Sequence, residues 1–153
     1  MTATDDTAVT LRRVIDAPRA RVFDAWTAPD EVRRWWGPGE FTCPEANIDL
    51  REGGAYRLVM RTPGGGDLIV TGNYREVRRP ERLVYTWRWT AGEPAGGSES
   101  VVTVEFHELG ERTEIVLSHT RFAAGEDTSP YRMGWEGGFD KLDRVLTGRA
   151  LHA

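Results

Sequence analysis

The sequence has few residues that could form disulfides or bind metal ions, because its 153 residues include one cysteine and three histidines. Cys43 alone cannot form an internal disulfide, and three scattered histidines cannot make a zinc site. No apolar run approaches the roughly 20 residues that span a membrane, and residues 1–8 lack the pattern of a secretory signal. We therefore expect a cytoplasmic protein with no metal, no other cofactor and no membrane insertion.

Lysine is also nearly absent, because 19 of the 20 basic residues are arginine and only Lys141 is lysine. Arginine forks match carboxylates and phosphates, so anion recognition is one interpretation. The arginines are spread along the whole chain among 24 acidic residues, which favours ordinary surface charge. The net charge of −4 argues against a nucleic-acid partner.

Length and composition are those of one globular domain, with 39% apolar and 10% aromatic residues. No internal repeat or long linker divides the chain. We expect a single domain over residues 9–149, a flexible N-terminal tail over residues 1–8, and a C-terminal tail over residues 150–153.

Helical spacing occurs near both ends of the chain. Val22, Phe23 and Trp26 recur on one helical face after Pro18, and Pro29 starts a second short helix that Gly37-Pro38-Gly39 ends. A helix of about 18 residues begins with Ser129 as its cap and ends near Gly148. Its apolar stripe consists of Tyr131, Trp135, Phe139, Leu142 and Leu146.

The rest of the chain has the period of two that is typical of strands. The segments are residues 9–15, 46–50, 55–61, 68–77, 83–90, 99–109 and 112–120, with a turn at 51–54 and a glycine-rich loop at 91–97. Consecutive strands without helices between them require an antiparallel sheet. Only the long C-terminal helix can cover its apolar face, so we expect an α+β fold with an internal space between a curved sheet and that helix.

Aromatic residues dominate the expected inner face of this sheet. Alternation groups Tyr85 with Trp87 and Trp89, and the C-terminal helix adds Trp135 and Phe139. One interpretation is a packed aromatic core, and the other is a ring-lined ligand cavity. Gly134 and Gly138 in the helix fit either close helix–sheet contact or room for a ligand.

His119 is the histidine that alternation places on the inner face. We expect burial to lower its pKa and to keep the ring neutral. The sequence has no nucleophile elbow, phosphate-binding loop or dinucleotide fingerprint. We therefore expect a binder rather than an enzyme.

The ordered motifs resemble the family related to the C-terminal domain of the activator of the 90-kDa heat-shock-protein ATPase, within the START-like (SRPBCC) superfamily. The matching segments are Ala17-Pro18 to Trp26, Pro29-Asp30 with Trp35 to Pro38, Asp49 to Gly54, Gly72 to Tyr74, Pro80 to Trp87, Val102 to Phe106, Thr113 to His119, and Gly134 to Leu142. The resemblance covers residues 9 to 147 and implies a helix-grip fold around a hydrophobic cavity. Many bacterial single-domain members of this superfamily have no assigned activity.

We interpret the protein as a single-domain binder of a small hydrophobic or aromatic molecule, acting as a monomer or a homodimer. The expected ligand-binding residues are Trp36, Phe41, Tyr56, Leu58, Tyr85, Trp87, Phe106, His119, Trp135 and Phe139. Tyr85 and His119 are expected to orient the polar end of the ligand. One alternative is a stress-response partner of a heat-shock chaperone, which an apolar surface patch would favour. The other is a cofactor-independent polyketide cyclase or aromatase.

Overall fold

The computed structural model describes residues 8–37, 39–91, 99–122 and 128–148. The elements, in chain order, are β1 (Val9–Ile15), α1 (Arg19–Thr27), α2 (Pro29–Trp35), β2 (Thr42–Ile48), β3 (Ala55–Arg61), β4 (Asp67–Arg78), β5 (Arg82–Ala91), β6 (Ser100–Leu109), β7 (Arg112–Thr120) and α3 (Ser129–Thr147). Most of the expected glycine-rich loop at 91–97 and both expected tails lie outside the described residues.

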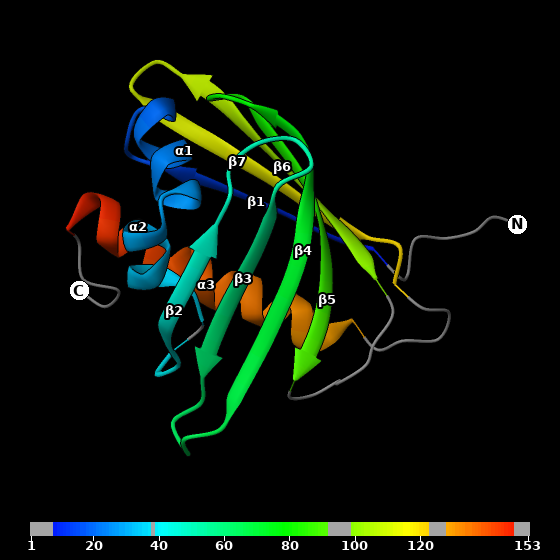
Figure 1. Cartoon of the computed structure of the whole chain (residues 1–153). Coiled ribbons are helices and arrows are strands. Elements are labelled where there is room, and N and C mark those ends of the chain that lie inside the picture. Colours follow the sequence, from blue (N-terminus) through cyan, green and yellow to red (C-terminus); the bar gives the residue numbers. More distant parts are fainter. Residues whose placement is uncertain (1–7, 38, 92–98, 123–127, 149–153) are drawn as a thin grey trace, which may run out of the picture.

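The seven strands form one antiparallel sheet in the order β1-β7-β6-β5-β4-β3-β2. The sheet curls, and the long helix α3 lies along its concave side with α1 and α2 near one end (Figure 1). This α+β helix-grip arrangement confirms the fold class expected from the sequence. The apolar face of the sheet is buried under the helices, which places the core between the two layers.

Two predicted boundaries were wrong. The second strand runs over Thr42–Ile48 rather than residues 46–50, because Asp49 already begins the turn, where its carbonyl accepts the backbone N–H of Arg51. The strand begins earlier because an irregular register between Thr42 and Glu45 accommodates Pro44, which has no N–H to donate. The cap of α3 is Thr128, not Ser129, which is the first residue of the helix.

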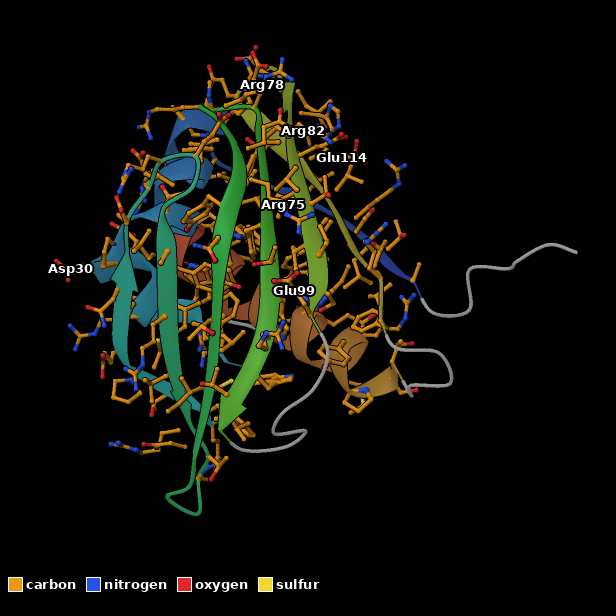
Figure 2. The ribbon with its side chains drawn as sticks, turned by 45° about the vertical axis from the view of Figure 1, so that its right-hand side comes forward. Asp30, Arg75, Arg78, Arg82, Glu99 and Glu114 are labelled. Atoms are coloured by element: carbon orange, nitrogen blue, oxygen red, sulfur yellow. The ribbon has the colours of Figure 1, made fainter. Side chains whose placement is uncertain are left out.

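Charged side chains cover much of the outer face of the sheet, where Arg75, Arg78, Arg82 and Glu99 are seen in Figure 2. They alternate in sign, as in the pairs of Arg82 with Glu105 and of Arg75 with Glu99. Exposed pairs of this kind each stabilise a fold by less than about 1 kcal/mol. The arginines that pair with carboxylates therefore fit the interpretation that they are ordinary surface charges rather than anion-binding residues.

Candidate functional site

The inner face of β5 carries a row of large side chains. Leu83, Tyr85, Trp87 and Trp89 are all buried, with at most 8% of each exposed. The intervening Arg88 is exposed, as expected from the alternation of a strand. The prediction that these rings face the helices is confirmed.

The helices close this row from the other side with further aromatic rings. Trp26 of α1 stacks on Trp135 of α3, with ring centres 6.1 Å apart and ring planes 17° apart. Trp36, just after α2, lies 5.7 Å from Trp87 and 5.4 Å from Trp135. Trp36 therefore joins the sheet side of the aromatic cluster to the helix side.

A small cavity remains between these rings, with a volume of about 20 Å³. It is lined by Trp26, Val32, Trp36, Ile48, Tyr56, Leu58, Tyr74 and Tyr85. A volume of this size holds about one water molecule. This cavity is thus nearly filled by the side chains that line it, and any larger guest has to displace some of them.

The structure brings most of the expected ligand-binding residues to this cluster. Trp36, Tyr56, Leu58 and Tyr85 line the cavity, whereas Trp87 and Trp135 contact the ring of Trp36.

The remaining four expected residues, which include the His119 described below, do not line the cavity. Phe106 and Phe139 pack edge-on against Trp26, with ring centres 5.7 and 5.9 Å from it, and are almost fully buried. Phe41 is half-buried and does not line the cavity.

Sequence reasoning missed four lining residues, Trp26, Val32, Ile48 and Tyr74. Tyr74 carries a readable signal, because alternation along β4 groups it with Val70 on the inner face. Trp26 was assigned to the buried face of a helix but not to the cavity wall. Val32 and Ile48 come from segments whose sequence shows no ring or polar tip to suggest a pocket.

Gly134 and Gly138 of α3 were expected either to allow close helix–sheet contact or to leave room for a ligand. A Cβ on Gly138 would lie 3.6 Å from the ring of Trp35, which is an ordinary contact distance, so the helix approaches Trp35 closely at this residue. A Cβ on Gly134 would meet nothing within 4 Å. Neither glycine adds lining to the cavity.

His119 is fully buried, and the protein occupies both nitrogens of its ring. The indole Nε1 of Trp135 donates to His119 Nδ1 at 3.1 Å, and His119 Nε2 lies 2.8 Å from Ser100 Oγ. Because Nδ1 accepts, Nε2 carries the proton and donates to Ser100. Ser100 Oγ in turn donates to the carbonyl of Trp87 at 3.4 Å.

This arrangement decides what His119 can do. Burial lowers its pKa to about 3, so the ring is neutral at neutral pH, as the sequence predicts. Since Nε2 is a donor, it cannot take a proton from Ser100, and the pair is not a nucleophile with its base. Nor is either nitrogen left over to orient a ligand in this conformation.

The buried tyrosines lining the cavity are likewise neutral. Tyr85 Oη accepts from Trp26 Nε1 at 3.3 Å, and Tyr56 Oη donates to the carbonyl of Thr86 at 2.5 Å. Burial raises the pKa of the Tyr56, Tyr74 and Tyr85 hydroxyls. These groups are hydrogen-bonding groups rather than acids or bases at neutral pH.

One polar group stands apart in this satisfied interior. Among the described residues, Trp87 Nε1 is the one buried side-chain nitrogen or oxygen that lacks a hydrogen-bond partner. Its ring is held between Trp36, His119 and Trp135, with centre distances of 5.1 to 5.7 Å. An unpaired buried donor costs about 1–3 kcal/mol, which an acceptor brought by a guest would recover.

Within the described ranges, no group of three histidine, cysteine or acidic residues could hold a metal ion. No helix formed by those residues is long and apolar enough to cross a membrane. The large apolar residues exposed there are Val14 of β1, Leu109 of β6, Met133 of α3, and Leu50 in the connection between β2 and β3.

Comparisons with known proteins agree with this architecture. Protein CV1439 from Chromobacterium violaceum is 24% identical, with a TM-score of 0.82 over 92% of this chain and 96% of that chain. An uncharacterised protein from Rhizobium leguminosarum is 28% identical, with a TM-score of 0.79 over 93% and 95%. An AHSA1 protein from Silicibacter pomeroyi is 23% identical, with a TM-score of 0.80 over 91% and 96%. No curated protein sequence matches.

The family model described as activator of Hsp90 ATPase homolog 1-like protein matches residues 16–147. This match spans both short helices, strands β2 to β7 and α3, which are the elements that enclose the aromatic cluster. The chain therefore belongs to the Activator of Hsp90 ATPase homolog 1-like (AHSA1) family, as its sequence motifs indicate.

Proposed function

We propose that this protein binds a small hydrophobic or aromatic molecule between the sheet and α3. The observation that carries the proposal is the unpaired indole N–H of Trp87, because every other buried side-chain nitrogen or oxygen of the described residues has a hydrogen-bond partner. A guest that supplies one acceptor oxygen removes the cost of this lone donor, while its rings or carbon chain gain from burial. The preferred ligand is therefore apolar with a single carbonyl, ether or hydroxyl oxygen.

Access requires Trp36 to move, because the cavity of about 20 Å³ holds no organic molecule. Trp36 is suited to this role, since it lies in the connection between α2 and β2 rather than inside an element. Its neighbour Gly37 has a φ of +97°, a conformation that residues with side chains rarely adopt. Rotation about this connection exposes the faces of Trp87 and Trp135 that Trp36 now covers.

The test uses two naphthalene probes of nearly equal size, 2-acetylnaphthalene and 2-ethylnaphthalene, of which only the first has a carbonyl oxygen. Both should bind, and the acetyl probe should bind more tightly. Trp87→Phe should weaken the acetyl probe about fivefold more than the ethyl probe, because the variant removes the N–H but keeps an aromatic ring.

Trp89→Phe is the matched control, because Trp89 Nε1 already donates to Tyr131 Oη at 3.0 Å. Trp89→Phe should change the affinities for the two probes by the same factor. If Trp87→Phe lowers the affinities for both probes equally, Trp87 only packs against the guest and does not donate a hydrogen bond to it. Failure of both probes to bind the unaltered protein would overturn the ligand-binding function.

A further inference from the structure

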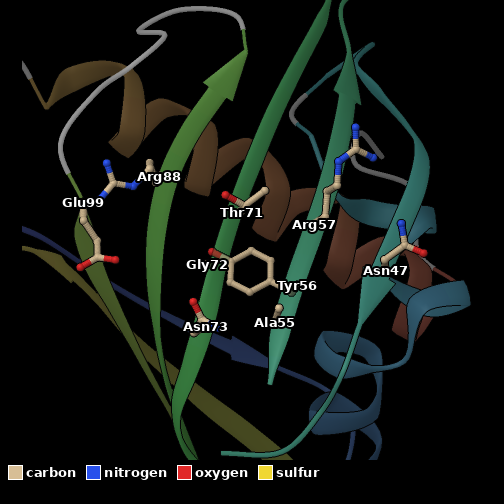
Figure 3. Close-up of a pocket in the computed structure, with 9 residues that line it drawn as sticks. All are labelled: Asn47, Ala55, Tyr56, Arg57, Thr71, Gly72, Asn73, Arg88 and Glu99. Carbon is tan, nitrogen blue, oxygen red and sulfur yellow. The ribbon is translucent and has the colours of Figure 1, made fainter. Parts of the chain in front are cut away.

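A larger pocket, of about 380 Å³, lies on the outer face of the sheet over β3, β4 and β5. Figure 3 looks onto this pocket with α3 behind the strands, so it opens away from the aromatic interior. Its volume falls within the range of small-molecule sites. Gly72 and Tyr56 are among the residues that line it.

The register of four strands builds one wall of the pocket. Asn47 pairs with Arg57, Arg57 with Thr71, and Thr71 with Arg88, so these four residues form one row across β2 to β5. Neighbouring strands lie about 4.8 Å apart, which places the backbones of the two arginines roughly 10 Å apart. Only the small side chain of Thr71 stands between them, as Figure 3 shows.

The charges around this row do not cancel. Arg57 Nη1 is 2.6 Å from Glu45 Oε2, and Arg75 Nη2 is 3.6 Å from Glu99 Oε1. Arg88, in contrast, has no carboxylate within 4.0 Å among the residues that the structure describes, although Glu99 lies on its side of the pocket. Among the described residues that line the pocket, the two guanidinium groups of Arg57 and Arg88 thus stand against one carboxylate, Glu99.

We infer that this pocket is a second binding site, separate from the interior, for the oxyanion of a small organic carboxylate or phosphate. Arg88 offers a planar fork for two oxygens of such a group. The hydroxyl of Thr71 and the remaining N–H groups of Arg57 are the next donors along the row. Glu45 and Glu99 flank the row on either side, so the site suits a single compact anion and disfavours a polyanion such as a nucleic acid.

The test is an NMR titration of the ¹⁵N-labelled protein with sodium phosphate and, separately, with sodium benzoate. Sodium chloride is exchanged for each salt at constant ionic strength, so that general screening does not change. The amide signals of Arg57, Thr71, Gly72, Asn73 and Arg88 should shift and saturate together. The tighter of the two salts identifies phosphate or carboxylate as the preferred group.

Arg88→Gln should weaken this binding at least fivefold, because it removes the charged fork but leaves an exposed side chain that the fold does not need. Arg61→Gln is the control, since Arg61 is an exposed arginine of β3 that is already paired with Asp67 at 2.9 Å. It should leave both affinities unchanged. Binding of the naphthalene probes should be the same in Arg88→Gln and the unaltered protein, which separates this site from the interior.

Non-saturating shifts spread over many arginines would overturn the inference, as would equal effects of Arg88→Gln and Arg61→Gln. If Arg88→Gln is destabilised, Thr71→Ala provides an independent test, because it removes the central hydroxyl of the row. Thr71→Ala should lower the affinity for the anion about threefold, and an unchanged affinity would count against the site.

Discussion

At the scale of single residues, His119 shows how burial decides chemistry. The imidazole accepts from Trp135 and donates to Ser100, so it links α3 to β6 and β7 through a neutral ring. A leucine at this position has a similar volume, but it would leave the buried Trp135 Nε1 without its acceptor and should destabilise the fold.

The buried imidazole should make stability depend on pH. Its pKa is about 3 in the folded protein and about 6.5 in the unfolded chain, so below pH 6.5 the unfolded state binds the extra proton. The contribution is present above pH 6.5 and is lost as the pH falls. We expect the free energy of unfolding to fall by about 2 kcal/mol between pH 7.5 and pH 5, where most carboxyl groups remain ionised.

Urea unfolding curves at both pH values measure this change. His119→Gln keeps polar atoms at this position but does not titrate, so its stability should vary much less between the two values. His107→Gln alters an exposed histidine beside Glu105 and should retain the pH dependence of the unaltered protein. An unaltered protein that is equally stable at pH 7.5 and pH 5 would contradict the assignment.

At the scale of elements, Gly72 shapes the junction between β4 and β5. The backbone N–H of Asn73 donates to Thr86 Oγ1 at 2.9 Å, and Tyr56 Oη donates to the Thr86 carbonyl, so side chains complete the pairing here. A Cβ on Gly72 would lie 2.0 Å from that carbonyl oxygen and 2.8 Å from Tyr56 Cε2. Any side chain at this position must force the two strands apart.

We therefore expect Gly72→Ala to destabilise the protein by about 2–4 kcal/mol, because a rigid backbone atom cannot yield to the new methyl group. Gly134→Ala provides the opposite case, since its Cβ meets nothing within 4 Å in the middle of a helix. It should stabilise the protein by about 0.5–1 kcal/mol. Thermal unfolding of both variants measures the difference, and a Gly72→Ala protein of unaltered stability would contradict the strand geometry.

Lys141 fixes the connection that contains Trp36. Its Nζ donates to the carbonyls of Gly37 and Phe41 at 2.7 and 2.8 Å, and burial lowers its pKa. The only lysine of the chain thereby ties α3 to the segment between α2 and β2.

Lys141→Met should release this segment while keeping the apolar stem of the side chain. We expect amide hydrogen exchange of residues 39–42 to become at least tenfold faster, because two charge-assisted hydrogen bonds are lost. Arg132→Met, an exposed change on the same helix, should leave that exchange unaltered. Equal exchange rates in the two variants would show that other contacts hold the segment.

At the scale of the whole molecule, the sequence predicts the layers well and the cavity poorly. Alternation identified the inner rings of β5 because one face of a curved sheet must be buried, whatever the details of packing. The free volume left between Trp26, Trp36 and Tyr85 depends on side-chain conformations contributed by several elements, which no local pattern encodes. The unpaired N–H of Trp87 is hidden for the same reason.

The sequence could not predict that Asn47, Arg57, Thr71 and Arg88 form one row on the outer face, and the reason is a different one. Its alignment depends on register irregularities between Ile69 and Val70 and between Tyr74 and Glu76. A shift of one residue would move each side chain to the other face. The even spread of arginine along the chain therefore gave no sign that Arg88 would lie in a pocket without a carboxylate partner among the described residues.

The central claim is that the aromatic interior opens to admit a guest, and titration with the neutral dye N-phenyl-1-naphthylamine tests it most directly. The dye should bind at one molecule per chain and quench tryptophan emission, because Trp26 and Trp36 line the space and Trp87 and Trp135 contact Trp36. It should also raise the melting temperature, since it binds the folded state. A dye that neither saturates nor shifts the melting temperature would show that the interior is a closed core and would contradict the proposed function.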